Sequence, residues 1–93
     1  MQIIIVGCGK VGRTLAEQLQ EEDTDITLID INADTINEIT DEVDAMGIVG
    51  NGASINTLME AGIETADILI AVTVSDEMNL LCCLIAQKTG HCH

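Results

Sequence analysis

The chain has 93 residues, which is enough for one small domain, and we expect residues 1–93 to form a single domain. Its net charge of −13 comes from 16 acidic and 3 basic residues, and this disfavours nucleic acid and anionic membrane surfaces as direct partners. Hydrophobic residues make up 47% of the chain, yet Phe, Trp, Tyr and Pro are absent, so the core must be aliphatic. Such a core suits parallel strands that are covered on both faces.

The sequence contains no pattern for membrane insertion or export. Met1 leads directly into an apolar strand, without the basic segment that begins a signal peptide. No apolar run approaches the roughly 18 residues that a transmembrane helix needs. We therefore expect a cytoplasmic protein whose cysteines are reduced.

The first thirty residues carry the most specific pattern in the chain. An aliphatic run over residues 2–6 predicts a strand, and residues 10–22 predict an amphipathic helix. The turn between them consists of Gly7, Cys8, Gly9, Lys10, Val11 and Gly12. A second strand over residues 25–29 then leads to Asp30. Strand, glycine turn, helix, strand and terminal acid follow one another as in a dinucleotide-binding βαβ unit.

The three glycines predict a phosphate-binding turn. Gly7 can adopt a positive φ as the chain leaves the strand. Gly9 leaves room for a pyrophosphate beside the backbone, and Gly12 lets the helix pack closely on the strand. The unpaired N–H groups at the start of the helix, together with the positive end of its dipole, favour an anion.

Asp30 predicts which dinucleotide is bound. It follows Gly12 at about the spacing of 20 residues that is expected for the acid that binds an adenosine ribose. A carboxylate there repels the 2′-phosphate of NADP, so the sequence favours NAD. The alternative is a tight turn in an α/β domain that has lost its ligand.

Two of the three basic residues, Lys10 and Arg13, lie at the glycine turn, where a pyrophosphate would bind. Arg13 has an alternative role, an ion pair with Glu17 one helical turn away. Cys8 lies near a helix N-terminus, which can lower the pKa of a thiol. A small side chain that fills the turn is the role we expect for Cys8.

The rest of the chain repeats the order of strand and helix. Helices are predicted over residues 32–42, 55–61 and 76–89, and strands over 45–49 and 66–72. A second glycine-rich turn consists of Gly50, Asn51, Gly52, Ala53 and Ser54. It can bring backbone close to a ligand, or it can simply end a strand.

Helix ends and apolar faces also follow from the sequence. Asn32, Ser54, and either Ser75 or Asp76 are candidate N-caps, and Gly62 is a candidate stop. The apolar side of the third helix is expected to consist of Ile55, Leu58 and Met59, and the apolar residues of the fourth are Leu80, Leu81, Leu84 and Ile85.

This alternation predicts the α/β class, with a Rossmann-like, doubly wound parallel sheet in the strand order 3-2-1-4. Because parallel strands end at one rim, residues 7–12, Asp30, 50–54 and 73–77 are expected to converge there. Ligands of such folds bind in the crevice where the strand order reverses, between strands one and four.

The sequence predicts no catalytic machinery. Its two histidines, His91 and His93, lie at the end of the chain, away from the crevice. They flank Cys92, but the spacings of zinc sites are missing, so no metal site is expected. Cys82 and Cys83 are expected to be core residues of the last helix.

Together with these features, the segment 73–79 (Thr-Val-Ser-Asp-Glu-Met-Asn) resembles the N-terminal nucleotide-binding lobe of Trk potassium-uptake regulatory subunits, the domain type called RCK or KTN. The resemblance covers residues 1–90. It implies that the domain is a cytoplasmic part of a gating ring and not an enzyme. Such a domain binds NAD or NADH, and sometimes ATP or ADP. Ligand occupancy would be transmitted to a membrane potassium transporter.

The resemblance also implies the roles of individual residues. Residues 7–11 would contact the pyrophosphate, and Asp30 would hold the adenosine ribose. Thr73 and Val74 would line the crevice beside the far half of the cofactor, with residues 51 and 52 along its rim.

Members of this family continue past the fourth helix, whereas this sequence lacks a fifth strand. The expected explanations are a fragment without the last strands or a shortened relative. A sheet that ends on the 66–72 strand would expose an apolar edge, which favours pairing with a second copy, so a homo-oligomer is expected. Two alternatives are a cofactor-binding fragment of an NAD-dependent oxidoreductase and an oligomerising piece without a ligand.

Overall fold

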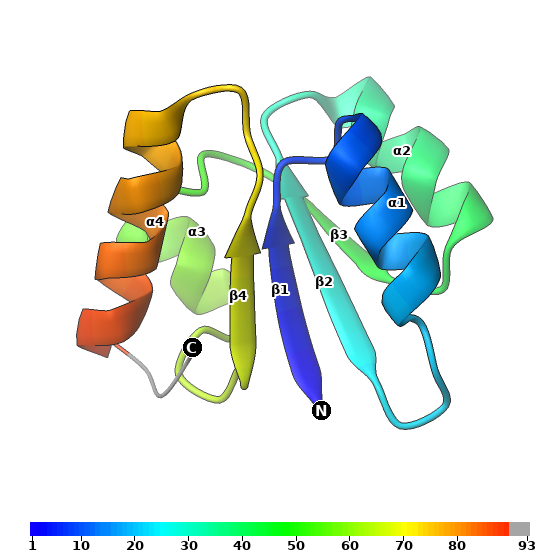
Figure 1. Ribbon diagram of the computed structural model, residues 1–93, viewed down its shortest axis with the longest axis horizontal. Coiled ribbons are helices and arrows are strands. Elements are labelled where there is room, and N and C mark those ends of the chain that lie inside the picture. The colour runs from blue at the N-terminus through cyan, green and yellow to red at the C-terminus, as the bar shows by residue number, and fades with distance from the viewer. Residues whose placement is uncertain (90–93) are drawn as a thin grey trace.

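The computed structural model describes residues 1–89, which form a parallel sheet between two pairs of helices (Figure 1). The strands are β1 (Gln2–Val6), β2 (Asp25–Asp30), β3 (Met46–Val49) and β4 (Ile68–Ala71), and their order is β3-β2-β1-β4. The helices are α1 (Lys10–Leu19), α2 (Ala33–Glu42), α3 (Ile55–Glu60) and α4 (Asp76–Thr89). The predicted doubly wound sheet with strand order 3-2-1-4 is confirmed. The His-Cys-His segment at residues 91–93, where no metal site is expected, lies outside the described residues.

The central strand β1 explains why this core is aliphatic. Successive side chains of a strand point to opposite faces, and both faces are covered here. Ile3 and Ile5 pack in the cluster under α1 and α2, whereas Ile4 and Val6 pack in the cluster under α3 and α4. All four side chains are buried, so an uninterrupted apolar run is what this position in the sheet requires.

The strand register brings the four carboxyl ends to one rim. Val6 is paired with Ile29 of β2 and with Ala71 of β4. Beyond the last pair, the N–H of Gly7 donates to the carbonyl oxygen of Ile29 at 2.8 Å. The loops that follow β1, β2 and β4 therefore start side by side.

Local hydrogen bonds confirm most of the predicted caps. Asn32 caps α2, because its Oδ1 accepts from the N–H groups of Asp34 and Thr35. Ser75 caps α4, because its Oγ accepts from the N–H of Met78 at 3.2 Å. Ser54 precedes α3, but its side chain makes no capping hydrogen bond.

Several predicted boundaries were too generous. Helix α1 ends at Leu19 rather than Glu22, because Gln20 already has an extended backbone. Strand β4 is limited to Ile68–Ala71, within the 66–72 run. Polar residues 20–22 are compatible with the surface of a helix, and apolar Ala66 and Val72 flank β4, so composition alone did not mark either end.

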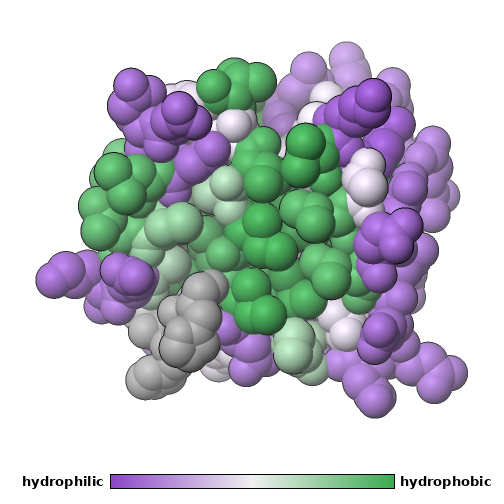
Figure 2. Space-filling view, viewed as in Figure 1, coloured by the Kyte–Doolittle hydropathy of each residue, from purple (hydrophilic) through white to green (hydrophobic). Residues whose placement is uncertain are grey.

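The predictions for α4 were partly confirmed. The helix buries Cys82, as expected, together with Ala86, and Cys83 packs against the core. The larger apolar side chains lie outside instead, since Leu80, Leu81 and Leu84 are 62%, 47% and 46% exposed. Figure 2 shows apolar surface over α4 and over the middle of this face.

No helix in residues 1–89 is long and apolar enough to cross a membrane.

The prediction for α3 was partly wrong. Leu58 is buried as expected, but Ile55 and Met59 are more than two-fifths exposed. A helix of six residues makes less than two turns, so few of its side chains reach the core, and Leu58 is the one that is buried.

Candidate functional site

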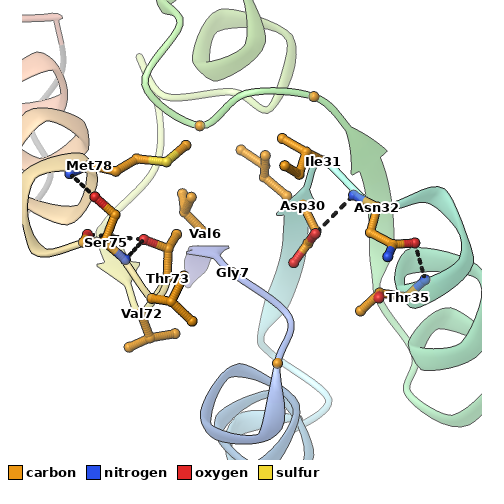
Figure 3. A pocket seen from close by; sticks show the side chains of 15 residues that line it. Val6, Gly7, Asp30, Ile31, Asn32, Thr35, Val72, Thr73, Ser75 and Met78 are labelled. Carbon is orange, nitrogen blue, oxygen red and sulfur yellow. Dashed lines mark hydrogen bonds between the residues drawn. The ribbon is translucent and has the colours of Figure 1, made fainter.

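A crevice of about 400 Å³ lies at the rim where the four strands end. Its floor is formed by the ends of β1 and β2 and by two glycine turns. One side, which we call the β2 wall, consists of Asp30, Ile31, Asn32 and Thr35. The opposite side, the β4 wall, consists of Val72, Thr73, Val74, Ser75 and Met78. Figure 3 shows the two walls facing each other across Val6 and Gly7.

The glycine turn has the geometry that the sequence predicts. Gly7 has a φ of +101°, and a Cβ there would lie 2.9 Å from the backbone nitrogen of Thr73. A Cβ on Gly12 would collide with the carbonyl oxygen of Gly7, so α1 sits directly against the end of β1. A Cβ on Gly9 would meet no atom within 4 Å. Of these three glycines, only Gly9 therefore has open space beside its backbone.

Helix α1 presents unpaired N–H groups next to that open space. Within residues 1–89, the N–H groups of Gly9, Lys10 and Val11 donate to no acceptor, and no side chain caps the helix. The first turn of α1 also carries no acidic residue. The positive end of the helix dipole is thus available to an anion in front of Gly9.

Asp30 supports the glycine turn as well as facing the crevice. Its Oδ2 accepts from the N–H of Cys8 at 2.8 Å, and its Oδ1 accepts from the N–H of Asn32 at 2.9 Å. Each carboxylate oxygen has a second lone pair, which can accept from a hydroxyl in the crevice. A substitution of Asp30 would therefore change the loop and a ligand contact together.

Cys8 points away from the crevice. Its side chain is 2% exposed and packs in the cluster under α1 and α2, and its thiol lies 3.8 Å from the carbonyl oxygen of Ile29. Its N–H is already bound to Asp30. Burial, and then the Asp30 carboxylate, raises the pKa of the Cys8 thiol to about 12. Cys8 fills the turn, and neither its thiol nor its N–H is free for a ligand.

Cys8 should consequently resist alkylation in the folded protein. With its pKa near 12 the thiol stays protonated at pH 8.5, and the thiolate is the reactive form. Of the three cysteines within residues 1–89, we expect iodoacetamide at pH 8.5 to modify the partly exposed Cys83 first and Cys8 only when urea unfolds the chain. Peptide mass spectrometry of the native and unfolded samples measures this. Rapid native labelling of Cys8 would contradict the buried position.

The two basic residues of the turn have different roles. Arg13 pairs with Glu38 of α2, with its guanidinium nitrogen 3.3 Å from the carboxylate, rather than with Glu17 as considered above. The pair joins α1 to α2 on the surface. Lys10, the first residue of α1, forms no ion pair within the described residues and adds positive charge near the glycine turn.

The structure brings some of the predicted site residues together and leaves others outside. Six of the predicted site residues line the crevice: Gly7, Gly9, Asp30, Gly52, Thr73 and Val74. Cys8, Lys10, Val11, Gly12 and Asn51 do not line it. Asn51 instead closes its own turn, because its Oδ1 accepts from the N–H of Ala53 at 2.9 Å.

Sequence reasoning missed several lining residues, of which Ile31 stands out. Its side chain is 72% exposed at the mouth of the crevice, directly after Asp30. The sequence did contain a signal for Ile31. An aliphatic side chain just beyond the end of a strand lies outside the sheet core, so it can line a crevice at that end. Ser75 lines the crevice as part of the 73–77 segment expected at this rim, whereas Met78 was not identified, because its placement depends on how α4 begins. No group of three metal-ligating residues occurs within residues 1–89.

A parallel, doubly wound sheet with a glycine turn at the strand-order reversal defines a Rossmann-like domain. Residues 3–93 match the family of the TrkA-N domain. The chain therefore belongs to the TrkA-N domain family.

Relatives within this family are clearly similar in sequence. The Trk system potassium uptake protein TrkA of Halomonas elongata is 46% identical over 87 residues, which are 94% of this chain and 19% of that protein. A TrkA homolog of Methanothermobacter thermautotrophicus is 42% identical over 88 residues, 95% of this chain and 41% of that protein. The chain thus spans between about a fifth and two-fifths of these relatives.

Solved structures share the fold at lower identity. The TrkA-N domain of the Escherichia coli inner membrane protein ybaL superposes with a TM-score of 0.85 at 22% identity, over 96% of this chain and 65% of that one. The C-terminal domain of Shewanella denitrificans Kef, solved in an AMP-bound form, has a TM-score of 0.81 at 20% identity, over 95% and 52%. At these identities the similarity is one of fold.

Proposed function

We propose that residues 1–93 act as a single NAD(H)-binding regulatory domain of a potassium-uptake system. In this proposal the domain is not an enzyme. It lies at the cytoplasmic face of the membrane, assembles with further copies of itself, and controls a membrane potassium-transporter subunit. Membership of the TrkA-N family and relatives named as potassium uptake proteins support the potassium role.

The observation that carries the ligand proposal is the arrangement around Gly9. Unpaired N–H groups at the start of α1 face open space, and Asp30 stands on the β2 wall beside it. Phosphate oxygens accept hydrogen bonds and ribose hydroxyls donate them, so these two groups match the two halves of a nucleotide. The AMP-bound form of the Kef domain, which has the same fold, is consistent with a nucleotide here.

The crevice also favours a dinucleotide over a mononucleotide. It extends past the glycine turn to the β4 wall, which would contact only the second half of a longer ligand. Lys10 and the dipole of α1 provide positive charge at the centre, where a pyrophosphate would lie. ADP and ATP share the adenosine and phosphate contacts, and they remain the competing ligands.

Regulation would operate by a shift of populations. A ligand changes an equilibrium between two assembly geometries only by its difference in affinity for them. The two walls belong to separate strands on either side of β1, so a ligand that contacts both would stabilise one separation of the walls. The assembly geometry with that separation would then favour one state of the transporter.

A thermal-shift titration with NAD, NADH, NADPH, ADP and ATP tests the ligand proposal. A ligand at about 100 times its Kd adds about 2.7 kcal/mol to the free energy of unfolding. For a domain of this size this is roughly 10 to 20 °C in Tm. We expect this shift with NAD or NADH and a clearly smaller one with NADPH, because its 2′-phosphate would approach the Asp30 carboxylate.

The outcomes of the titration are distinct. A larger shift with ADP or ATP would replace the dinucleotide by an adenine nucleotide in the same crevice. No shift with any of the five ligands would contradict nucleotide binding by this chain.

A further inference from the structure

One side chain outside the crevice, Asn79 of α4, holds the loop that forms the β4 wall. Its Oδ1 accepts from the backbone N–H of Thr73 at 2.9 Å and from the Thr73 hydroxyl at 2.6 Å. Its Nδ2 donates to the carbonyl oxygen of Thr73 at 3.1 Å. A single amide therefore binds the N–H, the C=O and the hydroxyl of Thr73.

These contacts determine where the hydroxyl proton of Thr73 lies. The backbone N–H of Thr73 can only donate, so the Asn79 atom beside it must be the oxygen. The Thr73 hydroxyl lies 2.6 Å from the same oxygen and 3.1 Å from the carbonyl oxygen of Ser75, so its one proton is directed at these acceptors, of which Asn79 is the nearer. The N–H of Ser75 donates to the Thr73 Oγ1 at 3.2 Å, which agrees with this orientation. Toward a ligand, Thr73 offers a lone pair and no proton.

The charges near the β4 wall are acidic, which disfavours an anionic group of a ligand there. The first turn of α4 carries Asp76 and Glu77, which already occupy the positive end of that helix dipole. Glu77 also accepts from the hydroxyl of Ser75 at 3.2 Å. Of the basic side chains in residues 1–89, Lys10 and Arg13 belong to α1, and Lys88 lies in the last turn of α4, remote from the crevice.

We propose that Asn79 is a positioning residue that makes Thr73 a pure hydrogen-bond acceptor, so that the β4 wall selects a neutral donor group on the ligand over a phosphate. A ribose hydroxyl or a carboxamide N–H satisfies this wall, whereas a phosphate oxygen meets a lone pair on a loop that leads into the acidic first turn of α4. The inference rests on the proposed function and deepens it. It explains how the site would prefer a dinucleotide to the phosphate extension of ADP or ATP.

Isothermal titration of the 93-residue chain with NAD, ADP and AMP tests the inference. In the proposed placement AMP would contact the α1 and β2 side alone, so it serves as the probe of that half of the site. We expect Asn79→Ala to weaken NAD about tenfold, the effect of losing about one hydrogen bond, and to change AMP and ADP by less than about twofold. Asn37→Ala, the same substitution on the exposed face of α2, should change none of the three affinities.

A second pair of variants addresses the hydroxyl directly. Thr73→Val should weaken NAD to a similar extent, and Thr73→Ser should restore it, because serine keeps the oxygen that Asn79 orients. This pair decides the question if Asn79→Ala does not fold.

Two results would overturn the inference in different ways. A parallel loss of NAD, ADP and AMP affinity in Asn79→Ala, or no loss in Thr73→Val, would show that the network only supports the fold. In that case the proposed function still stands. A wild-type chain that binds none of the three ligands would instead contradict the proposed function itself.

Discussion

Gly12→Ala is expected to lower the free energy of unfolding by about 3 kcal/mol, which is a large part of the stability of a small domain. The added Cβ would collide with the carbonyl oxygen of Gly7. Gly7 cannot move away, because its N–H is bound to Ile29 and its own backbone lies against Val72 and Thr73. Helix α1 must therefore separate from β1, which opens the cluster under α1 where Ala16 is fully buried.

Urea unfolding followed by circular dichroism measures this loss. Gly9→Ala is a matched control, because the same methyl group is added three residues earlier in the same turn without meeting any atom within 4 Å. Gly9 lies at the N-cap of α1, where alanine costs at most about 1 kcal/mol relative to glycine. Equal midpoints for Gly12→Ala and the wild type would contradict the tight contact between α1 and β1.

Substitution of Gly9 should have the opposite profile, with little loss of stability and a large loss of nucleotide affinity. Its backbone has φ −71° and ψ −163°, which any L-residue adopts. The side chain would project into the open space where the proposed pyrophosphate approaches the N–H groups of α1. We expect affinity to fall in the order Gly, Ala, Val, with Gly9→Val weaker than the wild type by about 100-fold or more.

The measurement is NAD affinity by calorimetry, with the unfolding free energy of each variant determined in parallel. Stability within about 1 kcal/mol of the wild type shows that the crevice, and not the fold, has changed. Full NAD affinity in Gly9→Val would remove the glycine turn from the binding site and leave its role purely structural.

The strands and the glycine turn could be predicted because their signals are local. Ile3–Val6 is apolar at every position, which only a strand covered on both faces requires. Gly7 and Gly12 are determined by one positive φ and one close approach, and both conditions lie within a few residues in sequence. The sheet order followed from the right-handedness of the crossovers.

The burial of Cys82 was predicted, but the exposure of the leucines of α4 was not, because it depends on packing distance. Its sequence offers leucines and small residues on different sides, and an apolar pattern ranks the leucines first. The sheet accepts Cys82 and Ala86 because small side chains allow a closer approach. Periodicity reports that a face is apolar, and it does not report how near the neighbouring layer lies.

Hydrogen-bond partners within the site were also beyond the sequence. Asp30 was identified as a ligand contact, but its bonds to the N–H groups of Cys8 and Asn32 depend on where the glycine turn and α2 begin in space. The bond to Asp30 also leaves the N–H of Cys8 unavailable to a ligand. Whether a backbone N–H in a turn is free depends on side chains from other strands.

By itself, the sequence determined that this chain is an α/β domain with a glycine turn and an acid at neighbouring strand ends. Those features need only short-range sterics, an apolar period and the chirality of crossovers, all of which are encoded locally. The tertiary structure alone decided which N–H groups remain unpaired, which face of α4 is buried, and that Asn79 orients Thr73. The unpaired N–H groups and the buried face of α4 depend on distances between segments that the sheet brings together, and the Asn79 contacts depend on how the chain turns from β4 into α4. An apolar period contains neither kind of information.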